Sequence, residues 1–190
     1  MKALFFTAAL AAALPVQAEQ FSVNIPELQN EAKGVIKELV TTLGSELKAA
    51  KKEGGAIAAI NVCNTKAEGL TKSVNDNSEW HVERTSLKLR NPQNAPDQWE
   101  KAILEQFESK AKQGANLKTL GFSQVVVDEE GRKVFRMMKA IPVADQCLAC
   151  HGSKIKPEIA EQLQTLYPED KATGFSTGDL RGAFSLKKYL

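Results

Sequence analysis

Apolar residues recur at helical spacing near the start of the chain. Between Pro26 and Lys52 they lie mostly three, four or seven residues apart, which places them on one face of a helix: Leu28, Val35, Ile36, Leu39, Val40, Leu43 and Leu47. Acidic residues in the early turns and lysines near the end suit the helix dipole. The sequence Glu53-Gly54-Gly55 then predicts a break.

A second, shorter helix is expected from Ala56 to Lys66, where the residues are mostly small and apolar. Ile57, Ile60 and Cys63 are three residues apart, so they lie near one face of that helix. Cys63 is therefore expected to look inward.

The rest of the chain shows strand patterns with helices between them. Partial alternation of apolar and polar residues predicts strands, of which two form a hairpin with a turn at E-E-G. These strands are expected over residues 79–90, 123–128, 132–141 and 178–190. Helices are expected from Asp97, as the N-cap, to Gly114 and over 157–166. The order of elements indicates an α+β fold around an antiparallel sheet.

Residues 1–18 have the features of an export signal. A lysine gives a positive start, an apolar run extends from Ala3 to Leu14, and Val16 and Ala18 are the small residues expected before a cleavage site. The run is too short to span a bilayer comfortably. The alternative is a buried N-terminal helix. We expect a signal peptide over 1–18, a single domain over 19–190, and a periplasmic location.

Charge and hydropathy exclude several classes of partner. The chain has 25 Lys and Arg against 23 Asp and Glu, a net charge of +2. This balance argues against nucleic acid or an anionic membrane surface as a strong electrostatic partner. No second long apolar segment occurs, so we expect a soluble mature protein without stable membrane insertion.

The sequence C-L-A-C-H-G at 147–152 carries the clearest chemical signature. C-x-x-C-H is the attachment pattern of c-type haem. Cys147 and Cys150 are spaced to reach two vinyl groups on one porphyrin edge, and His151 then ligates the iron. We therefore expect one covalently attached haem c with His151 as an axial ligand.

Two other interpretations of the cysteine pair fit less well. A structural zinc site needs four ligands from paired motifs, and no second C-x-x-C or H-x-x-x-H exists. A thioredoxin-like pair opens a helix directly after a strand of an α/β unit, whereas this pair follows a hairpin and is trailed by G-S-K-I-K-P.

The ligand on the other side of the iron is left open by the residues alone. Met137 and Met138 are adjacent in a predicted strand, so one is expected to point inward, and methionine is the usual partner in electron-carrying cytochromes c. His81 lies between two residues expected to be buried, which favours an exposed histidine. Cys63 is either a ligand, held as a thiolate, or a small buried hydrophobic residue.

Four stretches resemble the PAS-like c-type haem domain family of bacteria and cyanobacteria. They are A-I-A-A-I-N-V-C-N (56–64), R-T-S-L-K-L-R-N-P-Q-N-A-P-D-Q-W-E (84–100), C-L-A-C-H-G (147–152) and Y-P-E-D-K-A-T-G-F-S-T-G-D-L-R-G-A-F-S (167–185). The resemblance implies a PAS-like five-stranded antiparallel sheet with flanking helices. It also implies a haem ligated by the motif histidine and by a cysteine on an N-terminal helix, here His151 and Cys63.

Thiolate ligation favours ferric iron and weakens on reduction, which suits a switch. The expected function is therefore redox or small-ligand (gas) sensing by a monohaem c-type cytochrome that signals to a separate redox or signalling protein. The alternative is a periplasmic electron-transfer cytochrome c. No catalytic constellation is found, so no enzymatic activity is expected. Arg84 and Arg90 are candidate contacts to the haem propionates, or solvated arginines beside an ordinary turn.

Overall fold

The structure is a computed structural model that describes residues 23–190. The predicted export signal, residues 1–18, lies outside them. The described chain forms α1 (Ile25–Thr65), α2 (Ala67–Asp76), β1 (His81–Thr85), α3 (Gln98–Lys112), β2 (Gly121–Val127), β3 (Lys133–Pro142), α4 (Leu148–His151), α5 (Pro157–Leu166) and β4 (Leu180–Tyr189). Short 3-10 turns occur at Pro92–Asn94 and Asp145–Cys147.

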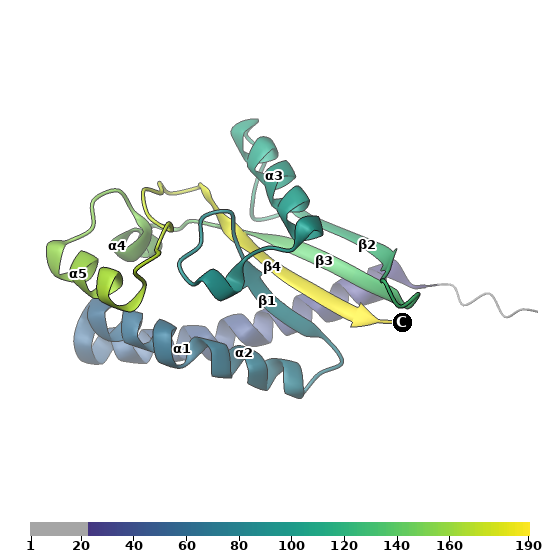
Figure 1. The fold of residues 1–190 in the computed structure, drawn as a ribbon, viewed down its shortest axis with the longest axis horizontal. Coiled ribbons are helices and arrows are strands. Elements are labelled where there is room, and N and C mark those ends of the chain that lie inside the picture. The colour runs from purple at the N-terminus through teal and green to yellow at the C-terminus, as the bar shows by residue number, and fades with distance from the viewer. Residues whose placement is uncertain (1–22) are drawn as a thin grey trace, which may run out of the picture.

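The strands form one antiparallel sheet in the order β1-β4-β3-β2 (Figure 1). The α+β class is confirmed. Within residues 23–190 the sheet has four strands, one fewer than the five that the family resemblance implied. The predicted hairpin is confirmed by the pairing of β2 with β3, and the predicted last strand is β4.

The first strand is shorter than the predicted range 79–90, because it ends at Thr85. Beyond it, the Ser86 hydroxyl donates to the Arg181 carbonyl at 2.7 Å and accepts from the Lys88 amide at 3.1 Å. These bonds turn the backbone out of the ladder. Prolines in the next stretch lack the N–H group that a ladder requires.

The two helices predicted at the start form a single element with a bend, α1. Its first part is capped by the Asn24 side chain, which accepts from the Glu27 amide at 3.3 Å. Gly54 and Gly55 have non-helical dihedral angles, and Gly55 has φ 67°. Glycine adopts this region without steric cost, so the two glycines bend the helix where the sequence predicted a break.

The apolar stripe of α1 packs on one face of the sheet. Trp80 and Phe135 meet there edge to face with ring centroids 5.8 Å apart. The buried cluster consists of Leu28, Ala32, Val35, Leu39, Val74, Trp80, Val82, Phe135, Met137 and Leu186. The hydrophobic face of the long helix is therefore occupied by the sheet.

The other face of the sheet is covered by α3. Asp97 and Glu100 form a capping box at its start, which confirms Asp97 as the N-cap. The buried cluster consists of Ile103, Leu104, Phe107, Leu117, Met138, Ala140 and Ala183. Because both faces are covered, the adjacent residues Met137 and Met138 are both buried, on opposite faces, rather than one of them alone.

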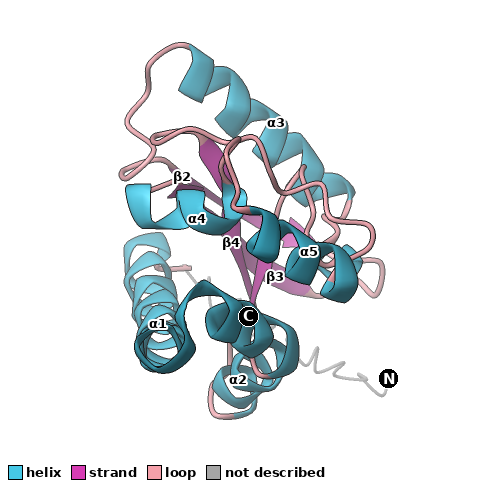
Figure 2. Ribbon diagram, turned by 90° about the vertical axis from the view of Figure 1, so that its left-hand side faces the viewer, coloured by secondary structure: helices cyan, strands magenta, loops and turns pink. Residues whose placement is uncertain are grey.

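The third part of the fold is a helical end that carries the cysteine motif. Helices α4 and α5 lie at one end of the sheet, beside the C-terminal part of α1 (Figure 2). Ile60 of α1 packs there with Ile159, Leu163 and Tyr167. The helix predicted over 157–166 is confirmed as α5, whereas α2 and the single turn α4 were not predicted.

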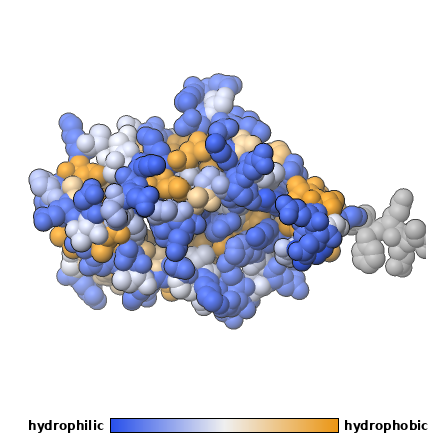
Figure 3. All heavy atoms as spheres, viewed as in Figure 1, coloured by the Kyte–Doolittle hydropathy of each residue, from blue (hydrophilic) through white to orange (hydrophobic). Residues whose placement is uncertain are grey.

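The surface is mostly polar on the face shown in Figure 3, with small hydrophobic groups between hydrophilic residues. Among the described helices, none combines the length and the apolar character needed to cross a membrane.

Candidate functional site

The cysteine motif lies on a short helical turn. Cys147 ends the turn Asp145–Cys147, and Cys150 lies within α4, Leu148–His151. Both cysteines are half-buried free thiols. Side chains at i and i+3 of such a turn lie on the same side. The predicted pair is therefore brought to one surface, together with the histidine that follows it.

A hydrogen bond orients His151. Its Nδ1 atom lies 2.7 Å from the carbonyl oxygen of Ala172. A carbonyl can only accept, so Nδ1 carries the proton and Nε2 keeps its lone pair. Burial, with Arg90 and Arg181 nearby, lowers the pKa of His151 to about 4. The imidazole is thus neutral at neutral pH, which is the form that binds a metal.

The backbone around Gly152 anchors the motif to the segment before β4. The Phe175 amide donates to the His151 carbonyl at 3.0 Å, and the Gly174 amide donates to the Gly152 carbonyl at 3.0 Å. A Cβ atom at position 152 would lie 2.6 Å from the carbonyl oxygen of Leu148. Glycine is therefore required where the chain leaves α4.

Arg90 links the motif to the loop that holds its histidine. Its Nε atom donates to Asp170 at 3.1 Å, and its Nη2 atom donates to the carbonyls of Cys150 at 2.5 Å and Ala172 at 3.3 Å. Asp170 also accepts from the Ala172 amide at 2.7 Å. This set of bonds, which we call the Arg90–Asp170 clasp, fixes the carbonyl to which His151 donates.

Cys63 faces the motif across a cavity. The cavity has a volume of about 370 Å³, and its lining includes Cys63, Cys147, Cys150, His151 and Tyr167. The prediction that Cys63 looks inward is confirmed in that its side chain is half-buried here. Burial raises the pKa of the Cys63 thiol, and the charges of Arg84 and Arg90 partly offset this effect.

Two further cavities, of about 580 and 420 Å³, adjoin this one, and all three share Arg90 and His151 in their linings. Arg84 and Arg181 line both of the further cavities. Burial lowers the pKa of Arg84, and it lowers the pKa of Arg181 to about 10.

In the part of the chain from 23 to 190, the Arg84 guanidinium has no hydrogen bond or ion pair to another side chain. Burying a charge without a partner costs free energy, so an anionic partner would stabilise this half-buried cation.

The two candidate arginines are thus placed differently. Arg84 is free to bind an anion, whereas Arg90 has two of its three nitrogen atoms engaged in the clasp. Its Nη1 atom is left for another acceptor. Arg181, which sequence reasoning missed, joins the group because β4 pairs with β1. No local pattern around Arg181 signals this position.

The remaining candidate ligands do not line the 370 Å³ cavity between Cys63 and the motif. His81 is exposed between buried Trp80 and Val82, as predicted, and it lies at the rim of the 580 Å³ cavity, 3.3 Å from the Asn75 side chain. Met137 and Met138 are packed in the two cores on either side of the sheet. Neither methionine lines any of the three cavities.

Comparisons with known proteins identify a family and a related solved structure. A crystal structure of the cyanobacterial haem protein Tll0287 matches with a TM-score of 0.61 and 25% sequence identity, over 85% of this chain and 94% of that one. A search of curated proteins finds no match. The sequence profile of the Tll0287-like family matches residues 11–188. The chain therefore belongs to the Tll0287-like family.

Proposed function

We propose that this protein is an exported monohaem c-type cytochrome that senses redox state or a small ligand. The observation that carries the proposal is that Cys63 and the motif C-L-A-C-H border the same cavity, although they lie far apart in the sequence. The relative of known structure, Tll0287, is a haem protein, which supports haem as the cofactor here.

The residues present fit a haem. The adjoining cavity of about 420 Å³, which Cys147 and His151 also line, has an apolar wall that includes Leu39, Leu43, Leu47 and Phe184. Cys147 and Cys150 offer two thiols for thioether bonds, and His151 presents Nε2. Arg84 supplies a cation for a propionate. When bound, the haem supplies an iron that changes between the ferric and ferrous states.

Each residue then has a role. The Arg90–Asp170 clasp and the Ala172 carbonyl hold the His151 ring in one orientation. Cys63 would hold a ferric iron as a thiolate, because a coordinated cation would lower the thiol pKa that burial raises. A ferrous iron would hold the thiolate less strongly, and the Cys63 side chain would then take back a proton.

The bend in α1 allows the binding and release of Cys63 to be coupled to a movement of its helical segment. Cys63 lies on the short helical segment after Gly54 and Gly55, and the backbone of both glycines departs from helical geometry. A segment joined through glycines can change its angle when Cys63 is released. Release of Cys63 would leave room for a small gas at the cofactor, or its helical segment would pass the change to a separate redox or signalling protein.

The test is the ferric absorption spectrum of the purified protein beside that of Cys63→Ala. We expect the substitution to abolish the spectral features of thiolate ligation while the covalent haem stays attached. Asn61→Ala is the matched control, because Asn61 is exposed on the same helical segment and accepts from Gln162 at 2.8 Å. Identical spectra for wild type and Cys63→Ala would remove the basis of the switch.

The second candidate function is electron transfer, and a potentiometric titration separates the two. Anionic sulfur stabilises ferric iron, so a sensor of this kind is expected to have a strongly negative midpoint potential. A positive midpoint potential would favour an electron-transfer cytochrome.

Covalent attachment of the haem has a separate test. If both Cys147 and Cys150 are replaced by alanine, the haem is expected to be extractable with organic solvent.

Export is also part of the proposal. Residues 1–18 carry the pattern of a cleaved signal, which supports export to the periplasm. Determination of the N-terminal residue of protein recovered from the periplasmic fraction is expected to give Glu19. Retention of Met1 in the cytoplasmic fraction would contradict this part of the proposal.

A further inference from the structure

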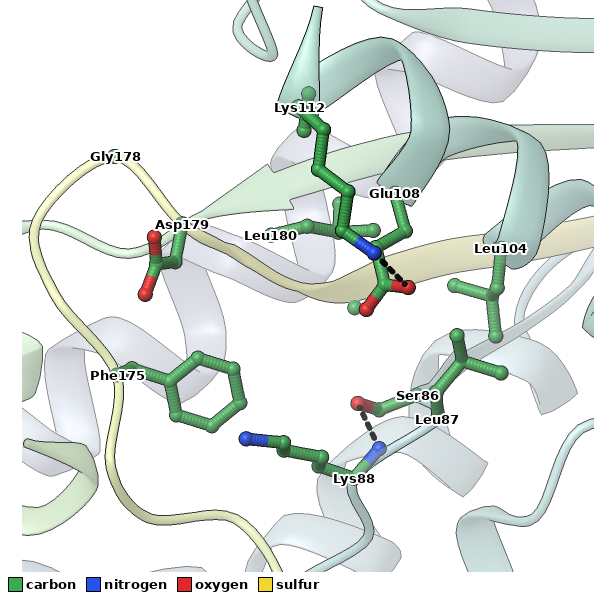
Figure 4. Close-up of a pocket in the computed structure, with 12 residues that line it drawn as sticks. Ser86, Leu87, Lys88, Leu104, Glu108, Lys112, Phe175, Gly178, Asp179 and Leu180 are labelled. Atoms are coloured by element: carbon green, nitrogen blue, oxygen red, sulfur yellow. Dashed lines mark hydrogen bonds and ion pairs between the residues drawn. The ribbon is translucent and has the colours of Figure 1, made fainter.

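A separate pocket lies on the α3 side of the sheet, away from the two thiols of the motif (Figure 4). It has a volume of about 250 Å³. Its walls come from the loop after β1, from α3, and from the segment 175–182 that leads into β4. Pockets for drug-sized ligands span roughly 300 to 1,000 Å³, so this one suits a smaller molecule.

The floor of this pocket is apolar. Leu104 is fully buried and Phe175 is 7% exposed, and Leu180 continues the surface between them. In Figure 4 these three side chains line the opening, from the helix on one side to the loop on the other. The accessible apolar surface of the pocket comes from Leu180, which is half-buried, and from Leu87, which is 36% exposed, so a ligand with an aliphatic stem gains free energy by covering these two side chains.

The charges around the floor are of both signs. Glu108 and Lys112 neutralise each other in an ion pair of 3.0 Å. The Lys88 ammonium lies 5.0 Å from the centroid of the Phe175 ring, and among residues 23–190 it has no ion pair. The Asp179 carboxylate accepts from the Ser176 amide at 2.7 Å and keeps its other oxygen. One cation and one anion are thus free beside an apolar floor.

The floor of this pocket also contacts the haem motif. The rings of Phe175 and His151 meet edge to face with centroids 6.3 Å apart, and the Phe175 amide bonds to the His151 carbonyl. The Arg181 guanidinium lies 5.6 Å from the same ring. Phe175 thus lies between the pocket that it lines and the predicted axial histidine.

We propose that this pocket binds a small zwitterion with an aliphatic stem, of the size of an amino acid, and that Phe175 transmits its presence to His151. The ligand carboxylate is bound by Lys88 and its ammonium by Asp179, with the stem on Leu87 and Leu180. The transmission to His151 rests on the proposed haem function, whereas the binding site does not.

The binding test is calorimetric titration of the full protein with two isomeric probes, L-norvaline and 5-aminovalerate. They have the same atoms but a different spacing of charges. Valerate and pentylamine are the controls that keep one charge each. We expect one of the isomers to bind more tightly than both controls. Absence of binding by both isomers, or equal binding by valerate or pentylamine, would overturn the site.

Substitutions then assign the contacts. Lys88→Gln and Asp179→Asn are each expected to weaken binding of the better isomer about fivefold, as for the loss of one partly exposed ion contact. Both residues are exposed, and asparagine keeps the acceptor for Ser176, so folding is expected to be unaffected. Lys101→Gln, on the exposed side of α3, is the matched control. Equal affinities for all three variants would contradict the assignment.

The effect of ligand binding on His151 through Phe175 is measured by absorption spectroscopy. Saturation with the better isomer is expected to shift the ferric absorption spectrum of the haem-loaded protein. Phe175→Leu, at a saturating concentration determined by calorimetry for that variant, is expected to remove the shift. Binding by calorimetry without any spectral shift would overturn the transmission through Phe175. It would leave both the site and the proposed haem ligation standing, so the failures are distinguishable.

Discussion

At the scale of single residues, the orientation of His151 depends on a carbonyl group that other side chains hold in place. The Ala172 carbonyl accepts from His151, and Arg90 and Asp170 together fix the backbone on which it lies. Arg90 and Asp170 have side chains 12% and 10% exposed, so their pairing is largely shielded from water. Loss of one partner leaves a buried charge without compensation.

Asp170→Asn tests this clasp. The asparagine keeps the shape but loses the charge that Arg90 requires, so the free energy of unfolding is expected to fall by about 1–3 kcal/mol. A less fixed carbonyl makes His151 a weaker donor, so the midpoint potential of the haem-loaded protein is expected to rise.

The measurements for this variant are urea unfolding and potentiometric titration. Asp76→Asn is the control, because Asp76 forms an exposed ion pair with Lys72 that contributes little. If Asp170→Asn and Asp76→Asn have equal effects on both quantities, the clasp has no positioning role.

At the scale of elements, the bend in α1 sets the position of Cys63. Gly55 combines φ 67° with ψ −152°, a region that only glycine adopts readily. Gly44, by contrast, lies within the regular part of the same helix, and a Cβ atom added there would meet nothing within 4 Å. The same substitution at these two positions therefore has opposite expected effects.

Gly55→Ala is expected to lower the free energy of unfolding by about 1–3 kcal/mol, because alanine is strained in this backbone region. Gly44→Ala is expected to raise it by up to about 1 kcal/mol, because alanine has the higher helix propensity. Both are measured by urea unfolding. Destabilisation by both substitutions alike would show that the bend does not depend on Gly55.

At the scale of the whole molecule, the closure of α3 on the sheet brings acidic residues of distant segments together. Glu83 of β1 faces Glu100 and Asp97 at the start of α3, and Lys187 of β4 and His81 lie nearby. The pKa of Glu83 is raised to about 7, mainly by burial and next by the negative charge of Glu100. The Glu83 carboxyl therefore holds a proton in the folded protein at mildly acidic pH.

This shift has a definite sign for stability. The unfolded chain has the ordinary glutamate pKa of 4.5, so between pH 4.5 and pH 7 the folded state binds more protons than the unfolded state. The contribution of Glu83 is thus most favourable below pH 4.5 and is lost as pH rises to 7. Glu83→Gln removes the charge, so it is expected to stabilise the protein at pH 8 and to have little effect at pH 5.

Urea unfolding at the two pH values measures this effect. Glu105→Gln, on the exposed side of α3, is the control, and it is expected to change stability little at either pH. Equal effects of Glu83→Gln at pH 5 and pH 8 would show that Glu83 does not carry the proton.

Local patterns predicted much of the fold because the physical causes are themselves local. The break at Gly54-Gly55, the N-cap Asp97 and the helix 157–166 all depend on neighbours within a few residues. The strand 79–90 was predicted too long, because its end depends on bonds from Ser86 to Arg181, which is far away in the chain. The short α2 was missed, although Ala67, Leu70 and Val74 recur at helical spacing within it.

The sequence by itself determined which groups are available for chemistry. The spacing of Cys147, Cys150 and His151 acts through a single helical turn, so no distant contact is needed to bring them together. Only the tertiary structure decided what surrounds them. The packing of α5 on α1 set Cys63 across the cavity, and the pairing of β4 with β1 added Arg181. Contacts between distant segments leave no periodic trace in the chain, because each depends on how whole elements pack.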